Sequence, residues 1–255
     1  MNSVVQVEFK KACEVGNLET VERLFDQVKD LELYMLQMRN LVVQQGYLNI
    51  LEYFYRRNVD ISRIYENNNP FKIAAHKGWV DVIDFLLKIK VDINLQDVYG
   101  WTSLMIASGY GNIDIIDRLF ATGQCNANIE NIFGDTALFI ATERGRPEIV
   151  DRLVVYGANY YHLNNDGENL LYNAVRSRNI NMIQKILSLG LDVNQQDIYG
   201  RTPLMTAVNF GNKEKIKILL EHGADPNIKN NFGQKASDFT VYENIKSLLT
   251  NLVSY

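Results

Sequence analysis

Residues 200–227 read GRTPLMTAVNFGNKEKIKILLEHGADPN, and similar text returns along the chain about every thirty-three residues. The turn glycine of each unit recurs at intervals of 34, 33, 33 and 33 positions, at Gly100, Gly134, Gly167, Gly200 and Gly233. A fixed period of this length is typical of a solenoid, because one unit is too small to bury its own apolar face and must stack on its neighbours. The pattern therefore predicts a repeat protein that presents a surface.

The segments within one unit each have a physical interpretation. The turn glycine supplies a positive φ, which other residues resist. Two residues later, a Thr or Asn is placed to cap the first helix, at Thr102, Thr136, Asn169 and Thr202. The second helix then carries apolar residues on one face, as at Ile113, Ile116, Leu119 and Phe120, with the spacing of an amphipathic helix.

In these features the chain resembles the ankyrin-repeat family, and residues 200–207 and 219–227 lie close to the family pattern. The resemblance implies an all-α fold, an α-solenoid of stacked helix-turn-helix repeats joined by β-turn or hairpin tips. Seven helix pairs are expected, starting near residues 5, 36, 69, 102, 136, 169 and 202, with a terminal cap near 235–250.

We expect one ankyrin-repeat domain over residues 1–255, because unit-to-unit stacking leaves no natural break. Its parts would be degenerate helical repeats at 1–65, regular repeats at 66–233 and capping helices at 234–255. The first part is called degenerate because no turn glycine is found near residue 34. In the unit at 169–187, Arg178 replaces the glycine that ends the first helix, so this unit should be the least regular.

The composition narrows the class of protein. Hydrophobic content of 47% and charged content of 22% are ordinary for a globular chain, and a net charge of −4 does not favour a nucleic-acid partner. No apolar run is long enough to span a membrane. Two cysteines cannot form a disulfide framework, which favours a reducing compartment such as the cytoplasm. Export as an effector without a cleaved signal peptide stays open, and we expect a monomer.

Motifs for catalysis are missing from the sequence. His76 and His162 have no Cys, Asp or Glu at metal-ligand spacing, and His222 stands where the ankyrin pattern commonly carries a histidine as part of turn packing. No phosphate-cradling loop or nucleophile motif occurs. We therefore expect no enzyme activity, no metal and no cofactor.

The family resemblance implies a binding surface on the concave side, made of turn tips and the exposed ends of the first helices. Aromatic and arginine residues, which dominate interface hot spots, occupy these positions. Carried over position by position, the partner-binding residues are Tyr99, Trp101, Tyr110, Phe133, Arg144, Arg176, Tyr199, Arg201 and Phe210. In a competing interpretation, residues that precede a turn glycine pack against the adjacent turn, and the arginines are scattered solvated charge. Trp101, Tyr110 and Phe210 are expected to be exposed.

The expected function is a non-catalytic module that binds another protein as an adaptor, an inhibitor or an effector. A small-ligand binder or an enzyme with its site in the same groove is one alternative, and a structural spacer is another. Separately, residues 187–194 resemble the pattern that asparaginyl hydroxylases recognise, which makes Asn194 a candidate modification site. A structural role of Asn194 in its turn is the favoured interpretation.

Overall fold

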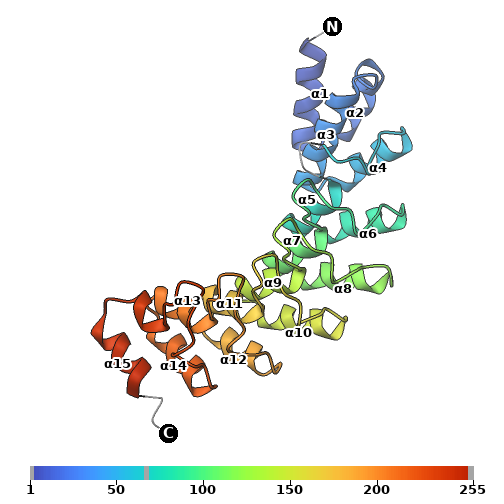
Figure 1. Cartoon of the computed structure of the whole chain (residues 1–255). Helices are drawn as coiled ribbons and strands as arrows, with labels where there is room; N and C mark the ends of the chain where they lie inside the picture. The colour runs from blue at the N-terminus through green and yellow to red at the C-terminus, as the bar shows by residue number, and fades with distance from the viewer. Residues whose placement is uncertain (1–2, 66–68, 252–255) are drawn as a thin grey trace. The chain divides into compact units, whose positions relative to one another are not determined.

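The computed structural model describes residues 3–65 and 69–251, which form two compact units, 1–126 and 127–255. The described residues contain helices, turns and one isolated bridge position, and none of them lies in a strand. Pairs of helices therefore make up the fold in both units (Figure 1).

The first unit consists of four helix pairs. Its helices are α1 (Ser3–Val15), α2 (Leu18–Leu24), α3 (Glu32–Gln45), α4 (Leu48–Arg56), α5 (Pro70–Lys77), α6 (Val80–Lys88), α7 (Ser103–Tyr110) and α8 (Ile113–Ala121), with a short 3-10 helix, η1 (Phe25–Gln27), after α2. Each first helix packs on the next, α1 on α3, α3 on α5 and α5 on α7. The second helices follow in a parallel row from α2 to α8.

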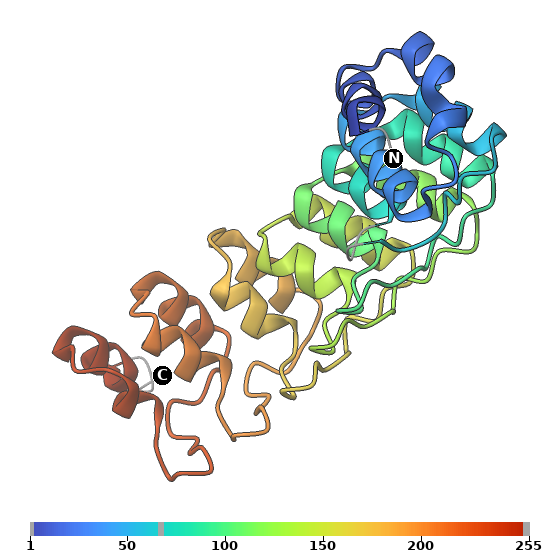
Figure 2. The same cartoon turned by 90° about the horizontal axis from the view of Figure 1, so that it is seen from above.

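The second unit consists of three helix pairs and a terminal cap. Its helices are α9 (Ala137–Glu143), α10 (Pro147–Val155), α11 (Leu170–Arg176), α12 (Asn181–Leu187), α13 (Pro203–Asn209), α14 (Lys213–Glu221), the 3-10 helix η2 (Ala236–Phe239) and α15 (Glu243–Asn251). In this unit α9, α11, α13 and η2 pack in a row, while α12, α14 and α15 form the row behind it. The connecting loops extend beyond the helix ends (Figure 2).

The seven predicted helix pairs are present among the described residues, and six begin within two residues of the expected position. The exception is α3, which begins at Glu32 instead of near residue 36. It runs for 14 residues because no glycine or proline interrupts the chain between Gly16 and Gly46.

Three of the four predicted helix caps are made. The Thr102 and Thr202 hydroxyls each accept a hydrogen bond from the backbone N–H three residues on, and the Asn169 side chain accepts one from Leu171. Thr136 occupies the same place before α9, but its buried hydroxyl has no hydrogen-bond partner in the described structure. The capping position is therefore correct in all four repeats, and the capping hydrogen bond is absent from one.

The helix α11 ends differently from its neighbours, as the missing glycine predicted. Its C-cap, Ser177, has an extended backbone (φ −57°, ψ 147°), whereas the helices on either side of it, α9 and α13, are each followed within two residues by a left-handed glycine, Gly145 (φ +68°) and Gly211 (φ +69°). The amine of Lys215, a buried residue of α14, donates hydrogen bonds to the carbonyls of Val175 and Ser177. Desolvation lowers the pKa of this amine. A lysine from the following repeat thus satisfies the carbonyls at this helix end.

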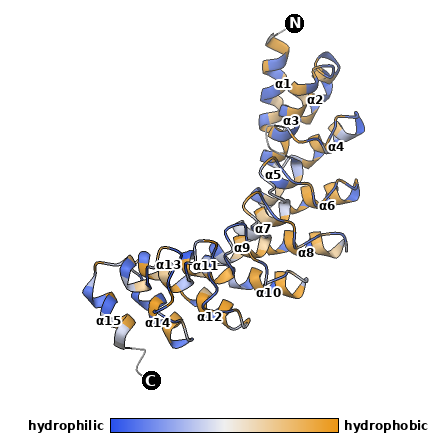
Figure 3. Cartoon of the chain, viewed as in Figure 1, coloured by the Kyte–Doolittle hydropathy of each residue, from blue (hydrophilic) through white to orange (hydrophobic). Residues whose placement is uncertain are grey.

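The hydrophobic residues of the two rows meet in the core. Leu104, Ile116, Leu171 and Leu219 are each 2% exposed or less. Helices α8 and α10 carry long hydrophobic stretches, whereas α15 begins with hydrophilic residues (Figure 3). This polar start of the terminal cap matches the need of a solenoid end to face solvent. In the part of the chain that the structure describes, no helix is long and apolar enough to cross a membrane.

Candidate interaction surface

The turn tips share one hydrogen-bonded geometry. Three residues before each turn glycine stands an Asp or Asn whose backbone N–H bonds the carbonyl four residues on. Its side-chain oxygen accepts hydrogen bonds from the backbone N–H groups two and four residues on. This arrangement recurs at Asp97, Asn131, Asn164, Asp197 and Asn230. Each tip is thereby fixed from inside, and the two residues before the glycine are turned outward.

Neighbouring tips of the second unit are hydrogen-bonded to each other. The Asn165 N–H donates to the Phe133 carbonyl at 3.1 Å, and the Asn231 N–H donates to the Tyr199 carbonyl at 3.0 Å. The Asn231 amide also donates to the Ile198 carbonyl at 3.0 Å. These bonds join successive repeats, so the outward-facing side chains sit on a rigid edge.

The predicted aromatic residues are mostly exposed. The exposed fractions are 53% for Tyr99, 55% for Tyr110, 59% for Phe133, 45% for Tyr199 and 60% for Phe210. Trp101 differs from the expectation, since it is half-buried. Trp101 follows the turn glycine, and its backbone N–H donates a hydrogen bond to the buried carboxylate of Asp97, so its backbone lies against the inside of the turn.

The predicted arginines of the second unit have different surroundings. Arg144 is exposed at the end of α9. Arg176 forms a two-pronged ion pair with Glu168, a carboxylate that is only 3% exposed, with Nη1 at 2.6 Å from Oε2. The hydrogen bonds that Arg176 donates to the Glu168 carboxylate hold the pKa of Arg176 above its usual value. Arg176 is therefore a fixed cation and not scattered surface charge.

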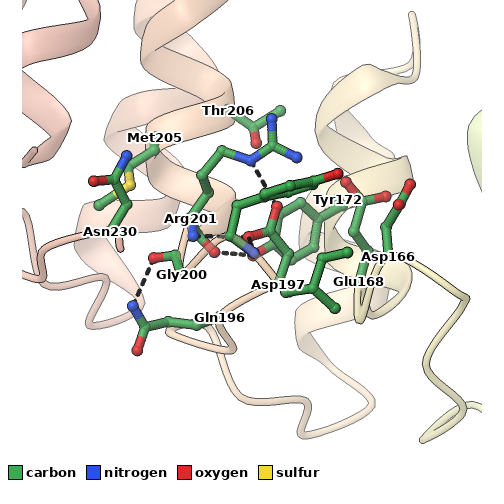
Figure 4. A network of polar contacts seen from close by, with 12 residues as sticks. Asp166, Glu168, Tyr172, Gln196, Asp197, Gly200, Arg201, Met205, Thr206 and Asn230 are labelled. Carbon is green, nitrogen blue, oxygen red and sulfur yellow. Dashed lines mark hydrogen bonds and ion pairs between the residues drawn. The ribbon is translucent and has the colours of Figure 1, made fainter. Parts of the chain in front are cut away.

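Arg201 belongs to a second fixed network (Figure 4). Its Nε donates to Asp197 Oδ2 at 2.7 Å, and its guanidinium carbon lies 4.9 Å from the centre of the Tyr199 ring. The buried Tyr172 hydroxyl lies within hydrogen-bond distance of the carbonyl oxygens of Gln195 and Arg201, which share its one proton, and burial raises its pKa. The turn and the helix α11 are in this way tied together beneath the surface.

A hollow of about 350 Å³ brings three of the predicted residues together. Its lining residues are Arg176, Arg201, Met205, Thr206, Asn209, Phe210 and Phe239. The other predicted residues of this unit that lie at the tips or at the end of α9, Phe133, Arg144 and Tyr199, do not line it. In the first unit, Tyr110 lines a separate hollow of about 530 Å³ and packs edge-on against His76, with ring centres 4.3 Å apart.

Several residues that shape this surface were not singled out from the sequence. The buried Asp197 and Glu168, and the apolar walls Met205 and Phe239, are among them. The recurrence of Asp or Asn three residues before each turn glycine was visible in the sequence and would have identified Asp197. Nothing comparable marked Phe239, which comes from η2 in the terminal cap.

The described side chains offer no metal site. No group of three or more His, Cys, Asp or Glu residues within the described ranges could hold a metal ion. Both cysteines are free thiols, and burial raises the pKa of each to about 12. A thiol with a raised pKa is a poor nucleophile at neutral pH.

Asn194 has a structural role in its turn. Its amide donates to the Gly223 carbonyl at 3.0 Å, and its side-chain oxygen accepts the Asp225 N–H at 2.8 Å. In the same manner, the Asn94 amide donates to the Gln124 carbonyl, and its side-chain oxygen accepts the Asn126 N–H. These contacts support the structural interpretation of Asn194; its hydroxylation stays a prediction.

Comparison with known families agrees with this geometry. The family model "Ankyrin repeats (3 copies)" matches residues 40–129 and 110–197, and the model "Ankyrin repeat" matches residues 199–231. The chain belongs to the ankyrin-repeat family. Ankyrin repeats are generally protein–protein interaction modules, and nothing in these matches indicates catalysis.

Individual relatives come from Fowlpox virus and from Saccharomyces cerevisiae. FPV031, an ankyrin repeat protein of Fowlpox virus (strain NVSL), is 33% identical over 164 residues, which are 62% of this chain and 48% of FPV031. The Saccharomyces cerevisiae protein named "Probable 26S proteasome regulatory subunit p28" is 28% identical over 179 residues, 68% of this chain and 78% of that protein. The chain thus spans about half the length of FPV031.

Solved ankyrin-repeat structures share the fold. The human ASB11 ankyrin repeat domain superposes with a TM-score of 0.73 at 24% identity, covering 84% of this chain and 96% of that domain. The ankyrin repeat domain of Bcl-3, a member of the IkappaB protein family, gives a TM-score of 0.69 at 22% identity, covering 83% of this chain and 97% of that domain.

Proposed function

We propose that this chain is a non-catalytic binding module for another protein. Its binding surface would consist of the turn tips and the ends of the first helices. The residues proposed to contact the partner are Tyr99, Trp101, Tyr110, Phe133, Arg144, Arg176, Tyr199, Arg201 and Phe210. The observation that carries the proposal is the series of exposed aromatic side chains on hydrogen-bonded, rigid tips. Exposed apolar side chains that gather on a surface mark interaction sites, and each unit contributes its own exposed aromatic residues.

The role would be that of an adaptor, an inhibitor or an effector. The chain would work as a monomer. Its two free thiols favour a reducing compartment such as the cytoplasm. A small-ligand binder or an enzyme in the same groove is the second candidate. The hollow that contains Arg176 and Arg201 is the observation that favours it. A structural spacer would need no exposed aromatic residues, so it ranks third.

Affinity capture from a lysate of the source organism tests the proposal. The wild type should retain a protein that a Tyr99→Ala, Tyr110→Ala, Phe210→Ala triple variant does not retain. All three side chains are exposed, so the variant should keep its melting temperature, whereas the half-buried Trp101 is left intact. Equal retention by both proteins would show that the binding site lies elsewhere on the chain. Turnover of a small molecule by the wild type would favour the enzyme instead.

A further inference from the structure

One subsite of the proposed surface has a chemistry specific enough to define what it binds. It is the hollow of about 350 Å³ between α11, α13 and η2, in the second unit. We propose that this hollow binds a peptide segment of a partner protein in which an Asp or Glu side chain lies next to a large apolar side chain. The inference rests on the proposed binding function and specifies its partner.

The carboxylate would be held by Arg201. The Asp197 carboxylate is fully buried, accepts the N–H groups of Tyr199 and Arg201, and fixes Arg201 Nε at 2.7 Å. The Tyr199 ring supports the guanidinium group from one face. Neither terminal nitrogen of Arg201 forms a hydrogen bond or ion pair with any described residue. A guanidinium group that is already oriented can bind a carboxylate with two parallel hydrogen bonds.

The exposed charge of the hollow is cationic. Two of its lining residues, Arg176 and Arg201, are cations, and none is an acid. The carboxylates that pair with them, Glu168 and Asp197, are 3% and 0% exposed, whereas the side chains of Arg176 and Arg201 are 33% and 39% exposed. An incoming carboxylate therefore meets the arginines first, which makes the hollow complementary to an acidic side chain.

Apolar side chains form one part of the hollow. Met205, Phe210 and Phe239 line it together with the polar Thr206 and Asn209, and Phe210 is 60% exposed. A free anion would leave these walls in contact with water, whereas a peptide with an adjacent Phe, Trp or Leu would cover them. The volume lies near the lower limit of ligand pockets, which span about 300–1,000 Å³. It is therefore suited to one or two side chains of a peptide.

A selection experiment identifies the bound sequence. The full chain is immobilised and panned against a phage-displayed library of random peptides. The expected result is enrichment of peptides with Asp or Glu within two positions of Phe, Trp or Leu. Absence of any enriched peptide, or enrichment without an acidic residue, would overturn the inference.

Affinity measurements then locate the peptide on the protein. One enriched peptide, synthesised with a fluorophore, is titrated by anisotropy against the wild type and variants. Arg201→Lys keeps the charge but loses the paired hydrogen bonds, and Phe210→Ala removes an exposed wall. Each should weaken binding roughly tenfold or more. Lys217→Gln, an exposed cation on α14 away from the hollow, is the matched control and should bind as the wild type does.

A double-substitution cycle gives the decisive readout. Changing the peptide's acidic residue to its amide should weaken binding to the wild type more than it weakens binding to Arg201→Lys, which keeps the charge but has already lost the paired hydrogen bonds. Additive losses would refute the contact between the carboxylate and Arg201. Melting curves identify any variant that fails to fold. If Arg201→Lys fails to fold, Phe210→Ala still tests the hollow, because it alters an exposed residue. Tight binding that depends on neither residue would overturn this inference and leave the general binding function standing.

Discussion

Replacing Gly200 by alanine should destabilise the protein more than the same replacement at Gly233. Both glycines end a turn with a positive φ, +74° and +77°. They differ in what an added Cβ would meet. At Gly200 it would lie 2.5 Å from Asn231 Oδ1 and 2.8 Å from the Asn231 backbone nitrogen, whereas at Gly233 no described atom lies within 4 Å.

The expected magnitudes follow from these contacts. The left-handed backbone alone costs a non-glycine residue about 1–2 kcal/mol, which applies to both positions. At Gly200 the turn of Asn231 must also move, which disrupts its hydrogen bonds to the carbonyls of Tyr199 and Ile198. Each such bond contributes about 0.5–1.5 kcal/mol. We therefore expect Gly200→Ala to lower the free energy of unfolding by about 2–5 kcal/mol and Gly233→Ala by about 1–2 kcal/mol.

Urea unfolding followed by circular dichroism measures both losses. The two tryptophans, Trp79 and Trp101, lie in the first unit, so their fluorescence reports on that unit separately. Coincident transitions by the two probes would justify a two-state analysis. Equal losses for the two variants, or a larger loss for Gly233→Ala, would refute the conclusion that contacts between tips contribute to stability.

Three further substitutions test the buried polar network of the second unit. Tyr172→Phe removes a hydroxyl that bonds two backbone carbonyls, and it should lower the free energy of unfolding by about 1–3 kcal/mol in urea unfolding. Arg176→Ala leaves the buried Glu168 carboxylate without its cation and should destabilise by about 1–3 kcal/mol; stability equal to the wild type would contradict the ion pair. Burial raises the pKa of Asp135, which means that the folded state favours the protonated carboxyl group. The stability that this group contributes is fully present below pH 3.8 and is lost as the pH rises through the raised pKa. Asp135→Asn should therefore melt at a higher temperature than the wild type at neutral pH, and the difference should vanish in acid.

The repeat positions could be predicted because glycine and the amphipathic spacing are local signals. A positive φ at Gly200 and the apolar face of α8 follow from residues close together in the chain. The start of α3 was predicted less well, since the first repeats carry no turn glycine to mark it.

The candidate site could be predicted only in part, because some of its residues depend on partners far away in the sequence. The exposure of Phe210 follows from its place at a helix end, and the exposure of Tyr199 from its place at a tip. The burial of Glu168 depends on its pairing with Arg176, eight positions away, and that of Lys215 on carbonyls about forty positions away. Charged residues are normally assigned to the surface, so these partners became visible only with the packed repeats.

The amine of Lys215 has a consequence for how this array can be divided. The carbonyls of Val175 and Ser177 accept hydrogen bonds from a residue of the next repeat. The segment 170–187 therefore cannot be exchanged as a module without the segment that follows it. A protein shortened before Lys215, or one in which the α13–α14 pair is replaced by an idealised sequence, would lose the helix α11 end together with the deleted part. The two repeats therefore form one structural unit that has to be transferred as a whole.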